Sequence, residues 1–149
     1  MRAGLRAGLA LLRVHQAVYD RSGGRVGHRL LGIECLLLRT VGRRSGRRRT
    51  AALAYARDGD DYLVVASVGG SDRPPGWLAN VRAEPAVEVQ VGRRRLGATA
   101  SVVEPGQAGY DGLWRLVNQR SGGRYRRYQA RTRRGLPVVA LRPTGRQLV

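Results

Sequence analysis

The sequence contains no lysine, a single cysteine and few acidic residues. All 28 Lys+Arg positions are therefore arginine, against 10 Asp+Glu, and the formal net charge is +18. This excess favours an anionic partner, which is a nucleic acid, a phosphate-bearing cofactor or an acidic membrane surface. Arginine binds phosphates and carboxylates bidentately, whereas lysine acts as a point charge. A coding bias toward arginine also removes lysine, and we take it as the main cause of this absence.

Other shortages exclude whole classes of site. A lone Cys35 cannot form an intramolecular disulfide, and with only His15 and His28 and no ligand-spaced acidic cluster we expect no metal site. No apolar run approaches the ~20 residues that span a bilayer. The run Leu9–Leu12 stops at Arg13 and is too short for a secretory signal. We therefore expect a cytoplasmic protein.

Six short β-rich runs separated by turn residues occupy the chain from residue 34 onward. They cover residues 34–40, 48–56, 62–67, 87–91, 95–103 and 136–141. Asp58-Gly59-Asp60 is a hairpin signal, so the first three runs are predicted to form a meander. Helical patterns occur at residues 77–82 and about 110–119. Without alternating βαβ units, this order predicts a mainly β fold with flanking helices (α+β), built as an antiparallel barrel.

The N-terminal segment has a different pattern. In residues 2–19, Leu5, Leu9 and Leu12 share one side of a helix and arginines lie beside them. This amphipathic helix either packs against the barrel or lies on an anionic membrane surface. A glycine-rich loop follows it. We therefore divide the chain into residues 1–24, helix and loop, and residues 25–149, a cofactor-binding barrel.

The densest chemical signal is the glycine-flanked turn of residues 40–49, which contains five arginines and Ser45. Glycine lets backbone approach a ligand closely, and guanidiniums with a hydroxyl suit a phosphate. On charge alone, a solvated basic hairpin explains the same residues.

Two further segments complete the candidate site. Residues 64–70 end a strand in small residues including Ser67, and Trp77 and Asn80 follow; together they could hold a flat heteroaromatic ring, although a lone tryptophan is commonly a core anchor. Farther on, Tyr125 and Tyr128 lie among arginines. Their i,i+3 spacing places both rings over one pocket, while the same interleaving could stack nucleic-acid bases.

In this order, the segments resemble the deazaflavin-dependent nitroreductase family, also described as F420-dependent quinone reductases. The resemblance covers about residues 25 to 143. It rests on Thr-x-Gly-Arg-x-Ser-Gly-x-x-Arg at 40–49, Arg57-Asp58-Gly59, Ala66-Ser67-x-Gly69-Gly70, Trp77-x-x-Asn80 before Pro85, Tyr125, Tyr128-Gln129 and Pro137-Val138-Val139.

The resemblance implies a split β-barrel of the flavin-reductase type that binds coenzyme F420 in preference to FMN. F420 carries a phosphate and an oligoglutamate tail, and the matching arginine-rich turn would bind them. The implied cofactor-binding residues are Arg43, Arg44, Ser45, Arg49, Leu53, Ala66, Ser67, Val68, Trp77, Asn80 and Tyr125. The implied activity is hydride transfer from F420H2 to a quinone, nitro or activated-alkene acceptor. For this chemistry we expect Ser67 or a backbone amide to polarise the acceptor, and Tyr128 or solvent to supply the proton.

The chain departs from the family pattern mainly on the acceptor side. Ala52 and Ala54 stand where a proline and a pocket-facing tyrosine are usual, and Val68 replaces a common basic residue. Ala54 and Tyr128 are therefore the expected substrate-pocket residues, with a widened pocket. The alternatives are a basic nucleic-acid-binding protein, although we expect no nucleic-acid partner, and a flavin- or haem-binding split-barrel protein without catalysis.

Overall fold

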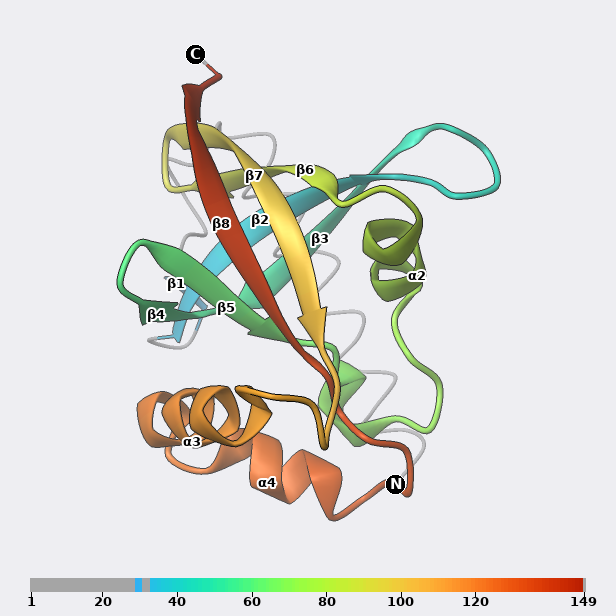
Figure 1. The fold of residues 1–149 in the computed structure, drawn as a ribbon, viewed down its shortest axis with the longest axis vertical. Coiled ribbons are helices and arrows are strands. Elements are labelled where there is room, and N and C mark those ends of the chain that lie inside the picture. Colours follow the sequence, from blue (N-terminus) through green and yellow to red (C-terminus); the bar gives the residue numbers. More distant parts are fainter. Residues whose placement is uncertain (1–28, 31–32, 149) are drawn as a thin grey trace.

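The computed structural model describes residues 29–30 and 33–148, so the predicted N-terminal helix at residues 2–19 lies outside the described residues. Eight strands occur in the described part of the chain (Figure 1). They are β1 (Arg29–Leu30), β2 (Ile33–Val41), β3 (Arg48–Ala54), β4 (Ala56–Asp58), β5 (Asp61–Val65), β6 (Ala86–Val91), β7 (Arg94–Val103) and β8 (Val138–Gln147).

The strands form one curved antiparallel sheet, in the order β1-β2-β6-β7-β8-β5-β4, with β3 added on β2. Its curvature places β7 and β8 across from β2 and β3 in a half-barrel (Figure 1). All six predicted strands are present, and the mainly β class is confirmed. The short β1 and β4 are additional to the prediction.

The predicted meander is wrong. In the described strands β3 pairs only with β2, whereas β5 pairs with β4 and β8. The last β2–β3 pair is Cys35 with Ala54. Beyond it the Tyr55 N–H still donates to the Glu34 carbonyl at 3.4 Å, and Glu34 pairs with β1 on its other side. From Ala56 the chain pairs with β5 instead, so the predicted run 48–56 divides into β3 and β4. The hairpin predicted at Asp58-Gly59-Asp60 joins β4 to β5.

The last strand continues six residues beyond its predicted end at Leu141. The long strand β7 offers partners for this extension, from Thr99 opposite Arg142 to Leu96 opposite Gln147. A register shift between Leu96 and Ala98 accommodates this section, where Pro143 lacks an N–H donor.

Three α-helices and one 3-10 turn accompany the sheet in the described residues: η1 (Val68–Gly70), α2 (Gly76–Ala83), α3 (Tyr110–Ser121) and α4 (Arg124–Gln129). Both predicted helices are thus confirmed. Helix α2 lies beside the projecting β2–β3 turn, whereas α3 and α4 lie together at the other end of the half-barrel (Figure 1).

Two helix contacts fix α3 and α4. The Asn118 side chain, 1% exposed, accepts a hydrogen bond from the Arg126 N–H at 2.9 Å and so joins α3 to α4. The Tyr110 hydroxyl donates to the Leu136 carbonyl at 2.7 Å. Burial, with the charges of Asp111 and Glu104, raises the pKa of Tyr110 to about 12, so this phenol remains a donor at neutral pH.

Strand β2 runs through the centre of the core. Leu36 and Leu38 point into the main cluster with Val64 and Val89, while Cys35 and Leu37 form a second small cluster on the opposite face. Both faces of the strand are therefore buried, which explains its continuous apolar sequence. Cys35 is buried, and its thiol donates to the Ile33 carbonyl at 3.6 Å.

Candidate active site

The basic turn, residues 42–49 between β2 and β3, has a tightly bonded backbone. The Gly42 N–H donates to the Arg47 carbonyl at 2.7 Å and the Gly46 N–H to the Gly42 carbonyl at 2.8 Å. The Ser45 hydroxyl accepts from the Arg47 N–H at 3.1 Å. A Cβ atom on Gly42 would lie 2.8 Å from the Ser45 Oγ and 3.0 Å from the Arg47 carbonyl oxygen, so a larger residue there would require the turn to shift. The turn is therefore a rigid platform for its arginines.

Four of these arginines carry uncompensated charge. Their side chains are exposed, and within residues 33–148 no carboxylate forms an ion pair with any of them. They are Arg43, Arg44, Arg47 and Arg49. Their positive charges remain available to an anion, whereas Arg48 pairs with Glu88 at 2.5 Å.

Glu88 neutralises arginines behind the turn. It is 8% exposed and also pairs with Arg39 at 2.8 Å and Arg95 at 3.0 Å. Burial raises the pKa of Glu88, but the hydrogen bond from Arg95 and the charges of Arg39, Arg48 and Arg95 outweigh it and lower that pKa below 4.5. This carboxylate stabilises the root of the turn and leaves the charge at its tip unmatched.

Asn80 connects helix α2 to the basic turn. Its Nδ2 donates to the Thr40 Oγ1 at 3.0 Å, and its Oδ1 accepts from the Arg43 N–H at 3.1 Å. Asn80 and Thr40 are 5% and 2% exposed, so both polar side chains are satisfied inside the protein. The asparagine that sequence patterns place beside the ring thus holds the turn and α2 together.

The apolar candidates lie in or against the main core. Trp77 is 8% exposed among Leu36, Leu38 and Leu78, and Leu53 is half-buried against the same cluster. The placement of Trp77 matches the core-anchor alternative, because only its small exposed part could meet a ligand. Leu53 offers more surface.

The loop that follows β5 has unusual backbone geometry. Ala66 is fully buried and Ser67 is 7% exposed, with a helical backbone (φ −98°, ψ −37°). Val68 has φ 45°, the one positive φ outside glycine in the described residues. For a β-branched residue this conformation costs about 1–3 kcal/mol and marks a site held by its surroundings. It also coincides with the predicted cofactor loop.

Tyr125 and Tyr128 are neighbours, as their spacing predicts, but only Tyr125 lines a pocket described below. On α4, the rings of Tyr125 and Tyr128 are 6.0 Å apart in an edge-on arrangement. Tyr125 is buried, and burial raises its pKa, although Arg124 opposes this. Tyr128 is half-buried, and its carbonyl would lie 2.6 Å from a Cβ atom on Gly70. Helix α4 therefore brings Tyr128 against the end of the Ser67 loop.

Ala52 and Ala54 lie on one face of β3. Register places Ala54 opposite Cys35 and Ala52 opposite Leu37. Tyr55 instead packs against the main core, with its ring 5.3 Å from that of Tyr62. Successive residues of a strand point to opposite faces, so Tyr55 does not replace a phenol at position 54.

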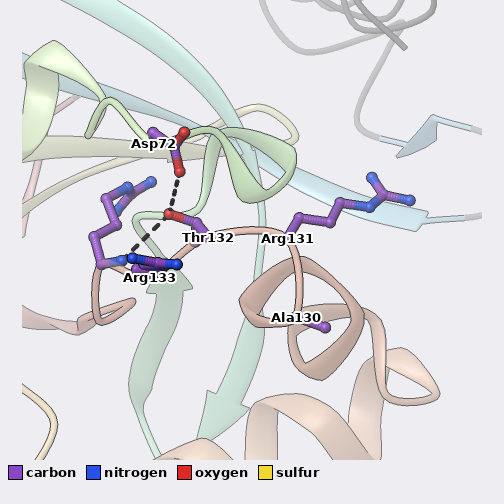
Figure 2. A pocket seen from close by; sticks show the side chains of 6 residues that line it. Asp72, Ala130, Arg131, Thr132 and Arg133 are labelled. Atoms are coloured by element: carbon purple, nitrogen blue, oxygen red, sulfur yellow. Dashed lines mark hydrogen bonds between the residues drawn. The ribbon is translucent and has the colours of Figure 1, made fainter.

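Two pockets border these elements. One, of about 380 Å³, lies between the start of β2, residues 55–57 and helices α3 and α4, with Tyr55 and Tyr125 in its wall. Neither Ala54 nor Tyr128 lines it. The other, of about 600 Å³, is formed by Asp72 and residues 130–134 (Figure 2).

Sequence reasoning missed Arg134. Its guanidinium donates to the carbonyl oxygens of Ser71, Ala66 and Ser67 at 2.8, 2.9 and 2.9 Å. Nothing in the sequence alone separates this arginine from the other 27, because its partners are backbone atoms more than 60 residues away.

The described residues carry two further negative findings. No helix in them is long and apolar enough to cross a membrane. They also contain no group of three or more His, Cys, Asp or Glu side chains placed to hold a metal ion. His15 and His28 lie outside the described residues.

Known proteins share sequence and fold with this chain. The family of F420H(2)-dependent quinone reductases matches residues 11–143. An F420H(2)-dependent quinone reductase of Mycobacterium tuberculosis is 50% identical over 135 residues, 90% of this chain and 91% of that protein.

Solved structures show the same relationship. A structure described as an F420-H2 dependent reductase has 33% identity and a TM-score of 0.63, covering 72% of this chain and 92% of that chain. A chain described as a domain-swapped dimer has 30% identity and a TM-score of 0.65, covering 90% of this chain and 98% of that chain. These relationships confirm the predicted split barrel and its predicted cofactor, coenzyme F420, at the level of the family. The chain belongs to the F420H(2)-dependent quinone reductase family.

Proposed function

We propose that this protein is an F420H2-dependent reductase that delivers a hydride to a quinone, nitro or activated-alkene acceptor. The observation that carries the proposal is the unpaired charge of the basic turn, joined through Asn80 to the α2 side of the barrel. A solvated basic hairpin would not need a buried asparagine behind it. The family assignment favours this function over nucleic-acid binding and over a non-catalytic flavin or haem carrier.

The residues present fit a polyanionic deazaflavin. Exposed guanidiniums without carboxylate partners suit a phosphate and a carboxylate-bearing tail, so Arg43, Arg44 and Arg49 would bind these groups together with the Ser45 hydroxyl. The ring would be held by the remaining predicted cofactor residues. These are Leu53, Ala66, Ser67, Val68, Trp77, Asn80 and Tyr125. When bound, the reduced cofactor supplies the hydride.

The protein's own residues would orient the acceptor and provide the proton that accompanies the hydride. The Ser67 side chain makes no helix-capping hydrogen bond, so its hydroxyl is suited to polarise an acceptor oxygen. Tyr128 is half-buried on the segment that contacts the Ser67 loop, and either it or solvent would deliver the proton. Ala54 is proposed to widen the acceptor pocket. No metal takes part in this scheme.

The direct test measures loss of F420H2 under anaerobic conditions with a menaquinone analogue, a nitroaromatic and an unsaturated ketone. We expect turnover with at least one acceptor, and tighter fluorescence-titration binding of F420 than of FMN, because FMN lacks the oligoglutamate tail. Equal affinities for the two cofactors would contradict the assignment of the basic turn. Binding of FMN or haem without turnover would favour a carrier.

We further propose that residues 1–24 form a unit apart from the barrel domain of residues 25–149, and that residues 2–19 attach the enzyme to anionic membranes. The support is the sequence alone: leucines and arginines adjoin on the predicted helix. Cosedimentation with vesicles of phosphatidylglycerol and phosphatidylcholine should fall on deletion of residues 2–19. Unchanged sedimentation would favour packing of this segment on the barrel.

A further inference from the structure

We propose that Arg134 is a positioning residue that holds the loop of residues 66–71 in the strained conformation required for tight cofactor binding. The inference rests on the proposed function, since it assigns Arg134 a task at the same site. It concerns a residue that the family-like motifs of this sequence do not include.

The guanidinium of Arg134 connects both ends of this loop. Its Nη1 and Nη2 donate to the Ala66 and Ser67 carbonyls, and its Nε donates to the Ser71 carbonyl. Three divergent donors on a rigid plane fix three carbonyl positions at once, which a lysine ammonium on a flexible stem cannot reproduce. Partial burial lowers the pKa of Arg134, and the charge of Asp72 opposes this. The three carbonyl oxygens thus replace part of the hydration of the half-buried Arg134 guanidinium.

The loop held in this way is under strain. Ser67 is helical, Val68 has φ 45°, and Gly69 and Gly70 follow at 63° and 85°. A helical residue followed by a left-handed one turns successive N–H groups toward one side, a geometry that suits an electron-rich ligand. Valine strongly disfavours that backbone, so the conformation persists only if other contacts offset its cost. The three Arg134 hydrogen bonds span Val68 and supply such contacts.

Arg134 is itself fixed by its neighbours. Its N–H donates to the Thr132 Oγ1 at 3.3 Å, and that hydroxyl donates to the Asp72 carboxylate at 2.8 Å (Figure 2). The Gln129 side chain donates to the Arg134 carbonyl at 2.8 Å. The same segment begins beside Tyr128, which contacts Gly70. Arg134 therefore couples the cofactor loop to the tyrosine-bearing helix.

The test compares Arg134→Gln and Arg134→Lys with Arg133→Gln. Arg133 is an exposed neighbour in the same pocket and donates no hydrogen bond to the loop, so its loss controls for charge and location. Hydrogen exchange of residues 67–71 is followed in the protein without cofactor, and F420 binding by fluorescence titration. Steady-state kinetics separate the KM for F420H2 from kcat, and thermal unfolding reports stability.

We expect both Arg134 variants to raise loop exchange and to raise the Kd and KM for F420 at least tenfold. Arg133→Gln should change each less than twofold. Adding Val68→Gly to Arg134→Gln should recover at least threefold in affinity, because glycine adopts the left-handed backbone without strain.

Unchanged loop exchange in Arg134→Gln would overturn the proposal, as would a lower melting temperature with unaltered F420 affinity or no recovery from Val68→Gly. If the wild type binds no F420, the proposed function fails, and loop exchange alone then decides whether Arg134 holds the loop. The two failures are therefore distinguishable.

Discussion

Removal of single arginines from the basic turn tests whether its charge serves a ligand. Arg43 and Arg49 are exposed and pair with no carboxylate in the described residues, so Arg43→Ala and Arg49→Ala should change folding stability by no more than about 0.5 kcal/mol. Each lost charge-assisted contact to the cofactor should weaken binding by about 1.5–3 kcal/mol. That range corresponds to roughly a 10- to 150-fold rise in Kd.

The control for net charge is Arg93→Ala. Arg93 is exposed in the turn between β6 and β7, and antiparallel pairing of β6 with β2 places that turn at the opposite end from the basic turn. Fluorescence titrations with F420 are run for all variants at low and high salt. Wild-type affinity should fall as salt rises, and the Arg43 and Arg49 variants should show a smaller fall, because salt screens the charges they lack.

The pattern of Kd changes among these variants distinguishes a specific role of the basic turn from an effect of overall charge. If Arg43→Ala, Arg49→Ala and Arg93→Ala shift the Kd equally, the effect is one of overall charge, and the turn has no specific role. If none of them shifts it, the turn is a solvated hairpin. A large loss of thermal stability in Arg43→Ala or Arg49→Ala would instead show that these side chains support the fold.

Three further predictions follow from packing and charge. Ala54→Tyr should raise turnover of a small nitroaromatic and lower that of a bulky quinone analogue, since the ring would refill the vacated volume; unchanged kinetics with every acceptor would show that position 54 does not face the site. Glu88→Gln should destabilise the protein at neutral pH. Because the folded-state pKa of Glu88 is lowered, its stabilising contribution is fully present above the unfolded-state pKa and is lost as the pH falls through the folded-state pKa. Denaturant unfolding should therefore show a stability difference between wild type and variant that shrinks as the pH falls below about 4.5. A difference that stays constant down to acidic pH would refute this. Asn80→Ala should cost about 1–3 kcal/mol in thermal or urea unfolding and weaken F420 binding, because it leaves buried Thr40 without its donor; unaltered unfolding would contradict the connecting role of Asn80.

Features that depend on interactions between neighbouring residues could be predicted from the sequence. Apolar runs bounded by glycine and aspartate identified the six main strands, since turn residues interrupt pairing wherever they occur. The spacing of Tyr125 and Tyr128 made the two rings neighbours, because helix geometry alone sets i,i+3 contacts, but it did not place both rings over one pocket. The basic turn was also visible, because its glycines and arginines are contiguous.

The strand order and the contacts within the candidate site depend on residues that are far apart in the sequence. The meander failed because the chain changes its pairing partner from β2 to β5 between Ala54 and Ala56, and because β5 pairs with β8 more than 70 residues later. Asn80 is expected beside the ring because its residue type suits a ligand, but its two hydrogen bonds to residues about 40 positions earlier in the chain could not be predicted from sequence. Sequence patterns contain no information on which distant polar groups a side chain will contact.

Arg134 shows the limit most clearly. In a chain with 28 basic residues, arginine by itself carries no signal, and only the folded path places this one against the Ala66, Ser67 and Ser71 carbonyls. The strain at Val68 was equally hidden, because valine in sequence favours a strand and only the surrounding contacts force a left-handed backbone. The sequence by itself therefore determined the features built from neighbouring residues, such as the strands and the basic turn. The contacts that shape the candidate site depend on tertiary structure, because only the fold brings distant backbone and side chains within hydrogen-bonding distance.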